Sequence, residues 1–174
     1  MCLNRAQSHA PLINAFSIIF HGSPAIRYAR EKKVPFLGIC LGMQAAVIEY
    51  ARSVLGISGA NSKEFAPDVS DKNAAVIFMP EGSKDQLGGT MRLGSRVTIL
   101  RENSLAAKLY NEKREVDERH RHRYEVNPDF IDNLEKSGLR FSGKDVRGER
   151  MEIIELEVRL RVIKYETLKN CEME

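Results

Sequence analysis

Cys40 lies between two glycines in the sequence GICLGMQ at positions 38–44. The apolar run 34–37 precedes this segment, and a helix-like run follows it. The pattern is that of a nucleophile elbow with a thiol in place of a hydroxyl, a tight strand-to-helix turn that holds its central residue in a sparsely populated backbone conformation. Side chains two positions away on either side would collide, so glycine is expected at Gly38 and Gly42. The spacing therefore predicts that Cys40 projects from the turn as a nucleophile.

The position of Cys40 at the first turn of a helix predicts a reactive thiol. Backbone amides and the helix dipole favour thiolate over thiol there, so we expect the helix terminus to lower the pKa of Cys40. The amide of Leu41 would point to where an oxyanion develops during attack on a carbonyl group. The simpler interpretation is a small buried apolar residue, which is the usual state of a free cysteine. The flanking glycines and the strand-to-helix context favour the nucleophile.

Composition fits one compact domain, because 174 residues with 43% apolar content can bury a core. The 27 basic and 24 acidic residues give a net charge of +3, which predicts no strong attraction to nucleic acid or membrane. Cys2, Cys40 and Cys171 are far apart, without metal-binding or disulfide spacing, which suits a reducing compartment. No apolar stretch approaches membrane length, and the first residues form no clean signal peptide. We therefore expect a cytoplasmic protein without a metal site.

The segments around the elbow carry helix and strand signals. Ser23 and Pro24 suit the N-cap and first position of a helix that ends near Lys32. A strand over 34–37 follows. Beyond the elbow, apolar residues recur at spacings of three and four, so a helix is expected to pack one face inward until Gly56 ends it. That face consists of Met43, Val47, Tyr50 and Val54.

The later part of the chain predicts strands over 74–79, 96–100 and 139–144 and from Met151 onward, with a polar turn around 147–148. Helices are expected over 105–110, capped by Ser104, and from Asn127 to near Gly138. Alternation of apolar and charged residues over 156–162 predicts one more strand. Helices on either side of the elbow strand imply a parallel sheet covered on both faces. The predicted fold is thus α/β, a doubly wound, mostly parallel sheet flanked by helices, with hairpin strands added later.

Several further motifs accompany the elbow. They are ANSKEF at 60–65, MPE at 79–81, GGTMRLG at 88–94, ERHRHRYEVN at 118–127 and GERMEIIE at 148–155. With the elbow, these segments make the stretch 25–156 resemble the glutaminase domain of the CTP synthases, which are class I glutamine amidotransferases of the triad type. The resemblance covers about three quarters of the chain and implies the flavodoxin-like form of the α/β fold.

The resemblance implies a role for each site residue. Cys40 is expected to attack the side-chain amide of glutamine, giving a glutamyl thioester and free ammonia. Leu41 would supply one oxyanion donor through its backbone, and Gln44 would hold the substrate in the pocket. Glu64 matches a position that binds the amino acid moiety, where a carboxylate suits a protonated amino group. Arg123 matches another glutamine-binding position. In isolation, Gln44 could instead be a solvated helix residue and Glu64 a loop carboxylate.

The carboxyl end departs from the family pattern. The family supplies a histidine base and its carboxylate in a His-Pro-Glu segment shortly after the strand that corresponds to 151–156. This chain has no such segment, and no histidine follows His122. His120 and His122 belong to the substrate-side segment, and alternation would turn both to one face, which makes either a poor substitute base. The catalytic His and Glu partners are therefore not found.

The amino-terminal end departs as well. The family's Gly-rich oxyanion loop is not recognisable in 17–22, and no phosphate-binding loop of the Walker type occurs in the chain. We therefore expect an atypical segment 1–22, an amidotransferase core 23–157 and a divergent tail 158–174, the last part of it disordered. The resemblance implies that ATP and Mg²⁺ act in the family's amidoligase domain, which this chain lacks, and that this domain or full-length synthase subunits are partners in a homotetramer.

Three functional interpretations stay open. The first is the glutaminase part of a CTP synthase, with little activity of its own. The second is a non-catalytic homologue that keeps the glutamine pocket or associates with full-length synthase, since loss of the base in a serine hydrolase costs on the order of a million-fold in turnover. The third assigns the basic and aromatic run 119–124 to nucleic-acid binding, which the near-neutral charge and the lack of a stacking platform disfavour.

Overall fold

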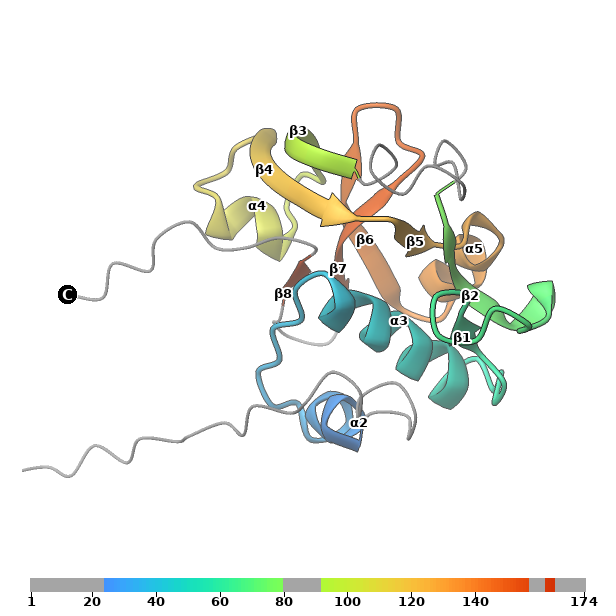
Figure 1. The fold of residues 1–174 in the computed structure, drawn as a ribbon. Helices are drawn as coiled ribbons and strands as arrows, with labels where there is room; N and C mark the ends of the chain where they lie inside the picture. The colour runs from blue at the N-terminus through green and yellow to red at the C-terminus, as the bar shows by residue number, and fades with distance from the viewer. Residues whose placement is uncertain (1–23, 80–91, 157–161, 165–174) are drawn as a thin grey trace, which may run out of the picture.

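The computed structural model describes residues 24–79, 92–156 and 162–164 (Figure 1). Its helices are α2 (Pro24–Lys32), α3 (Leu41–Ser53), α4 (Leu105–Leu109) and α5 (Pro128–Lys136), with a 3-10 turn at Asp71–Asn73. Its strands are β1 (Asn61–Ser62), β2 (Ala74–Phe78), β3 (Arg92–Leu100), β4 (Glu115–His122), β5 (Tyr124–Val126), β6 (Leu139–Asp145), β7 (Met151–Leu156) and β8 (Val162–Lys164). The expected segment 1–22, the cap residue Ser23 and the expected tail 158–174, apart from residues 162–164, lie outside the described residues.

The strands form two sheets. One has the order β4-β3-β6-β7-β8 and the other the order β1-β2-β5. The α/β class with flanking helices is confirmed, but the expected mostly parallel pairing is not what the described strands show, because only β1 and β2 pair in parallel. Short connections explain the difference: the turn 146–150 joins β6 to β7 and residues 157–161 join β7 to β8, and a parallel crossover needs a dozen or more residues.

The predicted helix starts are confirmed where the structure describes them. Proline occupies the first helical position of α2 and α5, where its missing amide costs no hydrogen bond. The Ser104 hydroxyl accepts a hydrogen bond from the Ala107 amide at 3.0 Å, and the Asn127 side chain accepts one from the Asp129 amide at 3.1 Å. Each N-cap satisfies an amide that has no partner within its own helix.

Three element predictions need correction. Residues 34–37 form no strand, because no described strand pairs with them, and Leu37 is 52% exposed. Helix α3 spans Leu41–Ser53, and Gly56, with a φ of 71°, ends it as expected, but Val54 is 39% exposed and is not part of the buried face. The expected single strand over 156–162 is also wrong, because Val162 in β8 turns back and pairs with Glu155 in β7.

The core lies on two sides of the five-stranded sheet. The larger cluster joins α2, α3 and α5 to β2, β5, β6 and β7, through fully buried side chains that include Met43, Val47, Leu134 and Phe141. The smaller cluster packs α4 against β3, β4 and β7. Figure 1 shows α3 in front of the sheets, with β8 beside its amino-terminal end. The start of α3, where Cys40 lies, is thus held between the sheets and the carboxyl end of the described chain.

Candidate active site

Cys40 has the strained backbone of a nucleophile elbow. Its φ is 54° and its ψ −108°, a region that non-glycine residues rarely adopt, and it is the residue immediately before α3. The turn is closed by a hydrogen bond from the Gly42 amide to the Ile39 carbonyl at 2.9 Å, and the Met43 amide donates to the Cys40 carbonyl at 3.1 Å. The predicted strained conformation is confirmed, although the preceding segment is not a strand.

The two elbow glycines are not equivalent. A Cβ at Gly38 would lie 2.7 Å from the backbone carbon and oxygen of Gly42 and 2.9 Å from the ring of Phe36. Backbone atoms cannot yield at that distance without reshaping the turn. At Gly42, by contrast, no described atom lies within 4 Å of where a Cβ would be. The expected steric conflict is therefore found at Gly38 and not at Gly42.

The Cys40 thiol is half-buried between α3 and β4. Its Sγ donates a weak hydrogen bond to the Arg121 carbonyl at 3.9 Å. Burial raises the pKa of this thiol, the neighbouring Leu41 amide lowers it, and the negative charge of Glu64 raises it again, with a net increase. This corrects the expectation of a pKa lowered by the helix terminus, because loss of hydration outweighs the single amide. Leu41 does place its amide beside the sulfur.

Glu64 and Arg123 are both within electrostatic reach of this site. Glu64 is solvent-exposed, so its carboxylate loses only part of its hydration; that loss raises its pKa, and the charge of Arg123 lowers it. The charge of Glu64 acts on Cys40 as well, and both Glu64 and Arg123 act on the ring hydroxyl of Tyr124. Segments around positions 40, 64 and 123, far apart in sequence, are thus brought together with a thiol, an anion and a cation.

Gln44 is a buried residue and not the solvated helix residue that its position alone allowed. It is 3% exposed, and its Nε2 donates to the Tyr124 carbonyl at 3.1 Å. A carbonyl oxygen only accepts, so this contact fixes which end of the amide faces β5. Among the described residues, no hydrogen-bond partner contacts its Oε1. Gln44, one helical turn from Cys40, therefore connects α3 to β5 through its Nε2, and its Oε1 is an acceptor that no described residue uses.

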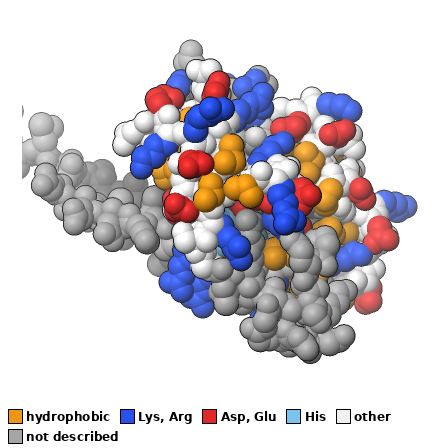
Figure 2. Space-filling view, turned by 90° about the horizontal axis from the view of Figure 1, so that it is seen from above, with side chains coloured by type: hydrophobic (Ala, Val, Ile, Leu, Met, Phe, Trp, Pro, Cys, Tyr) orange, Lys and Arg blue, Asp and Glu red, His pale blue; other side chains and the backbone are white. Residues whose placement is uncertain are grey.

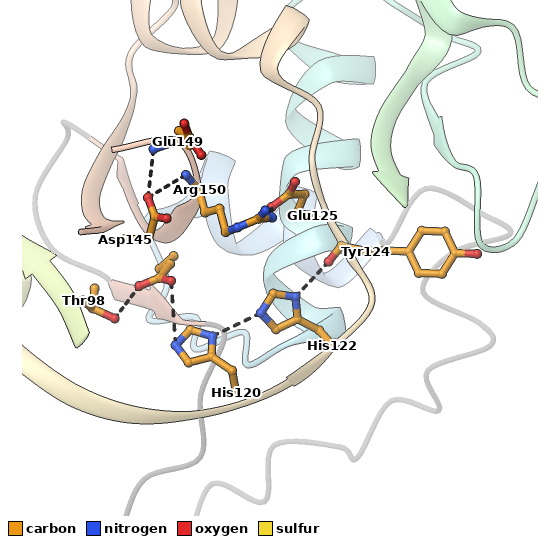
Figure 3. Close-up of polar contacts among 9 residues, drawn as sticks. Thr98, His120, His122, Tyr124, Glu125, Asp145, Glu149 and Arg150 are labelled. Atoms are coloured by element: carbon orange, nitrogen blue, oxygen red, sulfur yellow. Dashed lines mark hydrogen bonds and ion pairs between the residues drawn. The ribbon is translucent and has the colours of Figure 1, made fainter. Parts of the chain in front are cut away.

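A buried polar cluster runs behind β4 and β5 (Figure 3). The Nδ1 atom of His120 lies 3.1 Å from Nε2 of His122, and Nδ1 of His122 lies 3.1 Å from the Tyr124 carbonyl oxygen. The Nε2 atom of His120 lies 3.8 Å from Glu152, which accepts a hydrogen bond from Thr98. Because their ring nitrogens face these partners, neither imidazole is arranged as a base for Cys40, in agreement with the geometric expectation.

Sequence reasoning missed Thr98 and Glu152. A signal was present at Glu152, which is an acidic residue inside the otherwise apolar start of β7 and is 2% exposed. Buried carboxylates need hydrogen-bonding or charged partners, so a glutamate at such a position predicts a polar cluster. A second buried pair, Arg150 and Glu125, lies nearby and joins the turn before β7 to β5.

The face of the molecule in Figure 2 carries both basic and acidic side chains, which are interspersed around small apolar groups. Within the described ranges, no group of three or more His, Cys, Asp or Glu residues is placed to hold a metal ion. The same residues include no helix that is both long and apolar enough to cross a membrane.

Comparisons with known proteins agree with these observations. The sequence model of the family described as "Glutamine amidotransferase class-I" matches residues 19–161. CTP synthase 2 from Xenopus laevis is 58% identical over 134 residues, which are 76% of this chain and 23% of that protein. The CTP synthase of Schizosaccharomyces pombe is 59% identical over 134 residues, 75% of this chain and 22% of the relative. The chain thus spans less than a quarter of these proteins.

A solved structure shares the fold. The glutaminase domain of Trypanosoma brucei CTPS, solved with bound acivicin, superposes with a TM-score of 0.75 at 35% sequence identity, covering 82% of this chain and 55% of that chain. The boundaries 23–157 predicted for the core stay a prediction beside the matched range 19–161.

Proposed function

Because the chain belongs to the class-I glutamine amidotransferases, we propose that it is the glutaminase part of a CTP synthase, with Cys40 as the residue that attacks glutamine. One observation carries this proposal. The strained Cys40 at the start of α3 is close enough to Glu64 for the carboxylate charge to raise the pKa of the thiol, and the charge of Arg123 lowers the pKa of Glu64. A thiol, an anion and a cation around one elbow match the three functional groups of glutamine, namely amide, ammonium and carboxylate.

Each residue has a defined part in the proposed reaction. The Cys40 thiolate attacks the side-chain amide carbon of glutamine, and the oxygen that gains charge is stabilised by the Leu41 amide. The carbon–nitrogen bond then breaks, and the nitrogen leaves as ammonia after taking up a proton. Water hydrolyses the thioester to glutamate and restores the thiol. Glu64 would bind the ammonium group and Arg123 the carboxylate, through charge-assisted hydrogen bonds. Gln44 would contact the substrate through its Oε1.

This chain lacks a group that the proton transfers of the reaction need. The amide nitrogen leaves as ammonia only after it has gained a proton. The histidine that the family uses for proton transfer has no counterpart after His122. The raised pKa of Cys40 leaves less thiolate at neutral pH than an unperturbed cysteine would have. We therefore propose that the isolated chain binds glutamine and forms an adduct slowly, with turnover at or near background.

The complete reaction, amination of UTP to CTP with this ammonia, is proposed for the chain in association with an amidoligase domain or full-length synthase subunits. ATP and Mg²⁺ would act there and not at the elbow. The homotetrameric assembly of the family and a cytoplasmic location are part of the same proposal.

A second candidate is a non-catalytic homologue that keeps the glutamine pocket and associates with full-length synthase. The contacts of both ring nitrogens of His122 with His120 and with the Tyr124 carbonyl favour it, because this imidazole is then engaged away from the thiol. Both candidates predict that the isolated chain binds glutamine, and they differ in whether the chain can turn it over, so turnover by the isolated chain would exclude the second candidate.

The test combines intact-mass spectrometry with an ammonia assay. The purified chain is incubated with a chloroketone analogue of glutamine, and Cys40→Ala serves as the matched control. We expect one adduct on the wild-type chain, none on the control, and no ammonia from glutamine above the control rate. Ammonia release that depends on Cys40 would exclude the non-catalytic candidate, and absence of the adduct would contradict the glutaminase proposal itself.

A further inference from the structure

The buried polar cluster of Thr98, Glu152, His120 and His122 extends from β3 and β7 to the substrate side of the site. It starts at Thr98, whose hydroxyl donates to Glu152 at 2.5 Å, and passes from Glu152 to His120 and on to His122. It ends on the Tyr124 carbonyl. His120 is 0% exposed, Glu152 2% and His122 6%. A path of this kind is costly to bury, so its members hold one another in fixed positions.

The donors and acceptors along the path can be assigned from its end. A carbonyl oxygen only accepts, so Nδ1 of His122 carries a hydrogen and donates to Tyr124. In a neutral imidazole the other nitrogen is then an acceptor, so Nε2 of His122 receives the hydrogen on Nδ1 of His120. The Nε2 atom of His120 lies 3.8 Å from Oε1 of Glu152. The hydrogen-bond donation therefore runs from His120 through His122 to the Tyr124 carbonyl, and Glu152 lies at the other end of the His120 ring.

The carbonyl that ends the path is also the one that orients Gln44. Nε2 of Gln44 donates to the Tyr124 oxygen at 3.1 Å, as Nδ1 of His122 does from the other strand. Because the Gln44 nitrogen is bonded to the Tyr124 carbonyl, Oε1 of Gln44 points away from that carbonyl. This buried oxygen has no hydrogen-bond partner among the described residues. Leaving a buried acceptor unmatched is unfavourable, so an N–H group of a ligand would be stabilised there.

We propose that His122, fixed by His120 and Glu152, is a positioning residue for glutamine. It holds the Tyr124 carbonyl in place, and that carbonyl in turn fixes the Gln44 amide with Oε1 toward the N–H groups of the substrate. The inference rests on the proposed function, since it concerns how the same site recognises glutamine. It assigns no proton transfer to His122, whose ring nitrogens serve Tyr124 and His120.

Two substitutions separate positioning from mere packing. An asparagine places its amide nitrogen, a donor, near the position of imidazole Nδ1, whereas a glutamine places its terminal amide near Nε2, where its oxygen can accept from Nδ1 of His120. His122→Asn should thus keep the donor to Tyr124 and lose the contact with His120, and His122→Gln should do the reverse. The measurement is the concentration of the chloroketone glutamine analogue that half-saturates Cys40 labelling, together with the rate of Cys40 alkylation by iodoacetamide, in the full chain.

We expect the half-saturating concentration to rise about 3- to 10-fold in His122→Gln, the effect of one lost hydrogen bond, and to stay within about twofold in His122→Asn. The iodoacetamide rate should be the same in all three proteins, because the thiol itself is not altered. Urea unfolding of both variants shows how much stability each loses.

Equal half-saturation in wild type and both variants would overturn the positioning role while leaving the proposed function standing. Equal losses in both variants, in step with their unfolding midpoints, would overturn it in favour of packing alone. If the wild-type chain reacts with iodoacetamide but not with the analogue, the proposed function fails, and the positioning role fails with it.

Discussion

At the scale of single residues, the chemistry of the site depends on competing effects on one sulfur. The Leu41 amide favours the thiolate of Cys40, whereas burial and the charge of Glu64 favour the thiol, and these two prevail. The elbow motif predicted the strained position of Cys40 correctly, since the glycine spacing encodes it. It could not predict the net pKa shift, because the shift depends on Glu64, 24 positions further along the sequence.

The electrostatic role of Glu64 is testable through the pH dependence of alkylation. A carboxylate near a thiol disfavours the thiolate and raises the pKa of the thiol, so removing the charge should lower it. In Glu64→Gln, the rise of the iodoacetamide rate with pH should therefore move to lower pH. The matched control is Asp68→Asn, an exposed acid on the same loop, which should leave the profile unchanged. An unchanged or upward-shifted profile in Glu64→Gln would contradict this assignment.

The polar residues show where sequence reasoning stops. Arg123 and Glu64 could be proposed from motif positions, but the burial of Gln44 could not be read from a helix pattern that left it between apolar neighbours. Glu152 in β7 lies next to His120 in β4, and the two residues are too far apart in the sequence for a local pattern to predict the contact. Such contacts depend on the register of the sheet, which local propensity does not encode.

At the scale of elements, helices with caps were predicted well and strands less well. Asn127 with Pro128, and Ser104, mark helix starts that the structure reproduces, because a cap is a local interaction. The strand β4 was missed because its eight residues, EVDERHRH, are almost all polar, although Val116, His120 and His122 are its buried positions. Residues 34–37 were predicted as a strand on their apolar character, but a strand also needs a neighbour to pair with.

The elbow itself gives a prediction for fold stability. A Cβ at Gly38 would lie 2.7 Å from the Gly42 backbone, so Gly38→Ala should destabilise the chain by about 1–3 kcal/mol through overpacking. Gly42→Ala meets no described atom within 4 Å and replaces a helical glycine, so its effect should range from neutral to a gain of about 1 kcal/mol. Urea unfolding of both variants measures the difference, and equal stability would show that Gly38 is not sterically constrained.

At the scale of the whole molecule, a buried ion pair links the two sheets. Arg150, in the turn before β7, pairs with Glu125 in β5, which belongs to the other sheet. The side chains are 9% and 7% exposed, so each charge depends on its partner in a poorly hydrated environment. The carbonyl of Tyr124, next to Glu125, accepts the hydrogen bonds from His122 and Gln44. The ion pair therefore supports the strand on which the proposed substrate contacts depend.

Removing one charge of this pair should be costly. Arg150→Met leaves the Glu125 carboxylate buried and should cost about 3–5 kcal/mol, whereas the double variant with Glu125→Gln should recover part of that loss. Arg147→Met, in the exposed part of the same turn, is the matched control and should stay within about 0.5 kcal/mol of wild type. Additive losses in the double variant, measured by urea unfolding, would show that the two residues act independently.

If the elbow of this chain is a glutamine site, the substrate itself should protect Cys40 from alkylation. The rate at which iodoacetamide alkylates Cys40 is followed by mass spectrometry while L-glutamine or D-glutamine is added. We expect L-glutamine to slow alkylation in a saturable manner and D-glutamine to do so only at much higher concentration, because Glu64 and Arg123 together would distinguish the arrangement around the α-carbon. A rate that neither compound changes would mean that glutamine does not occupy the site.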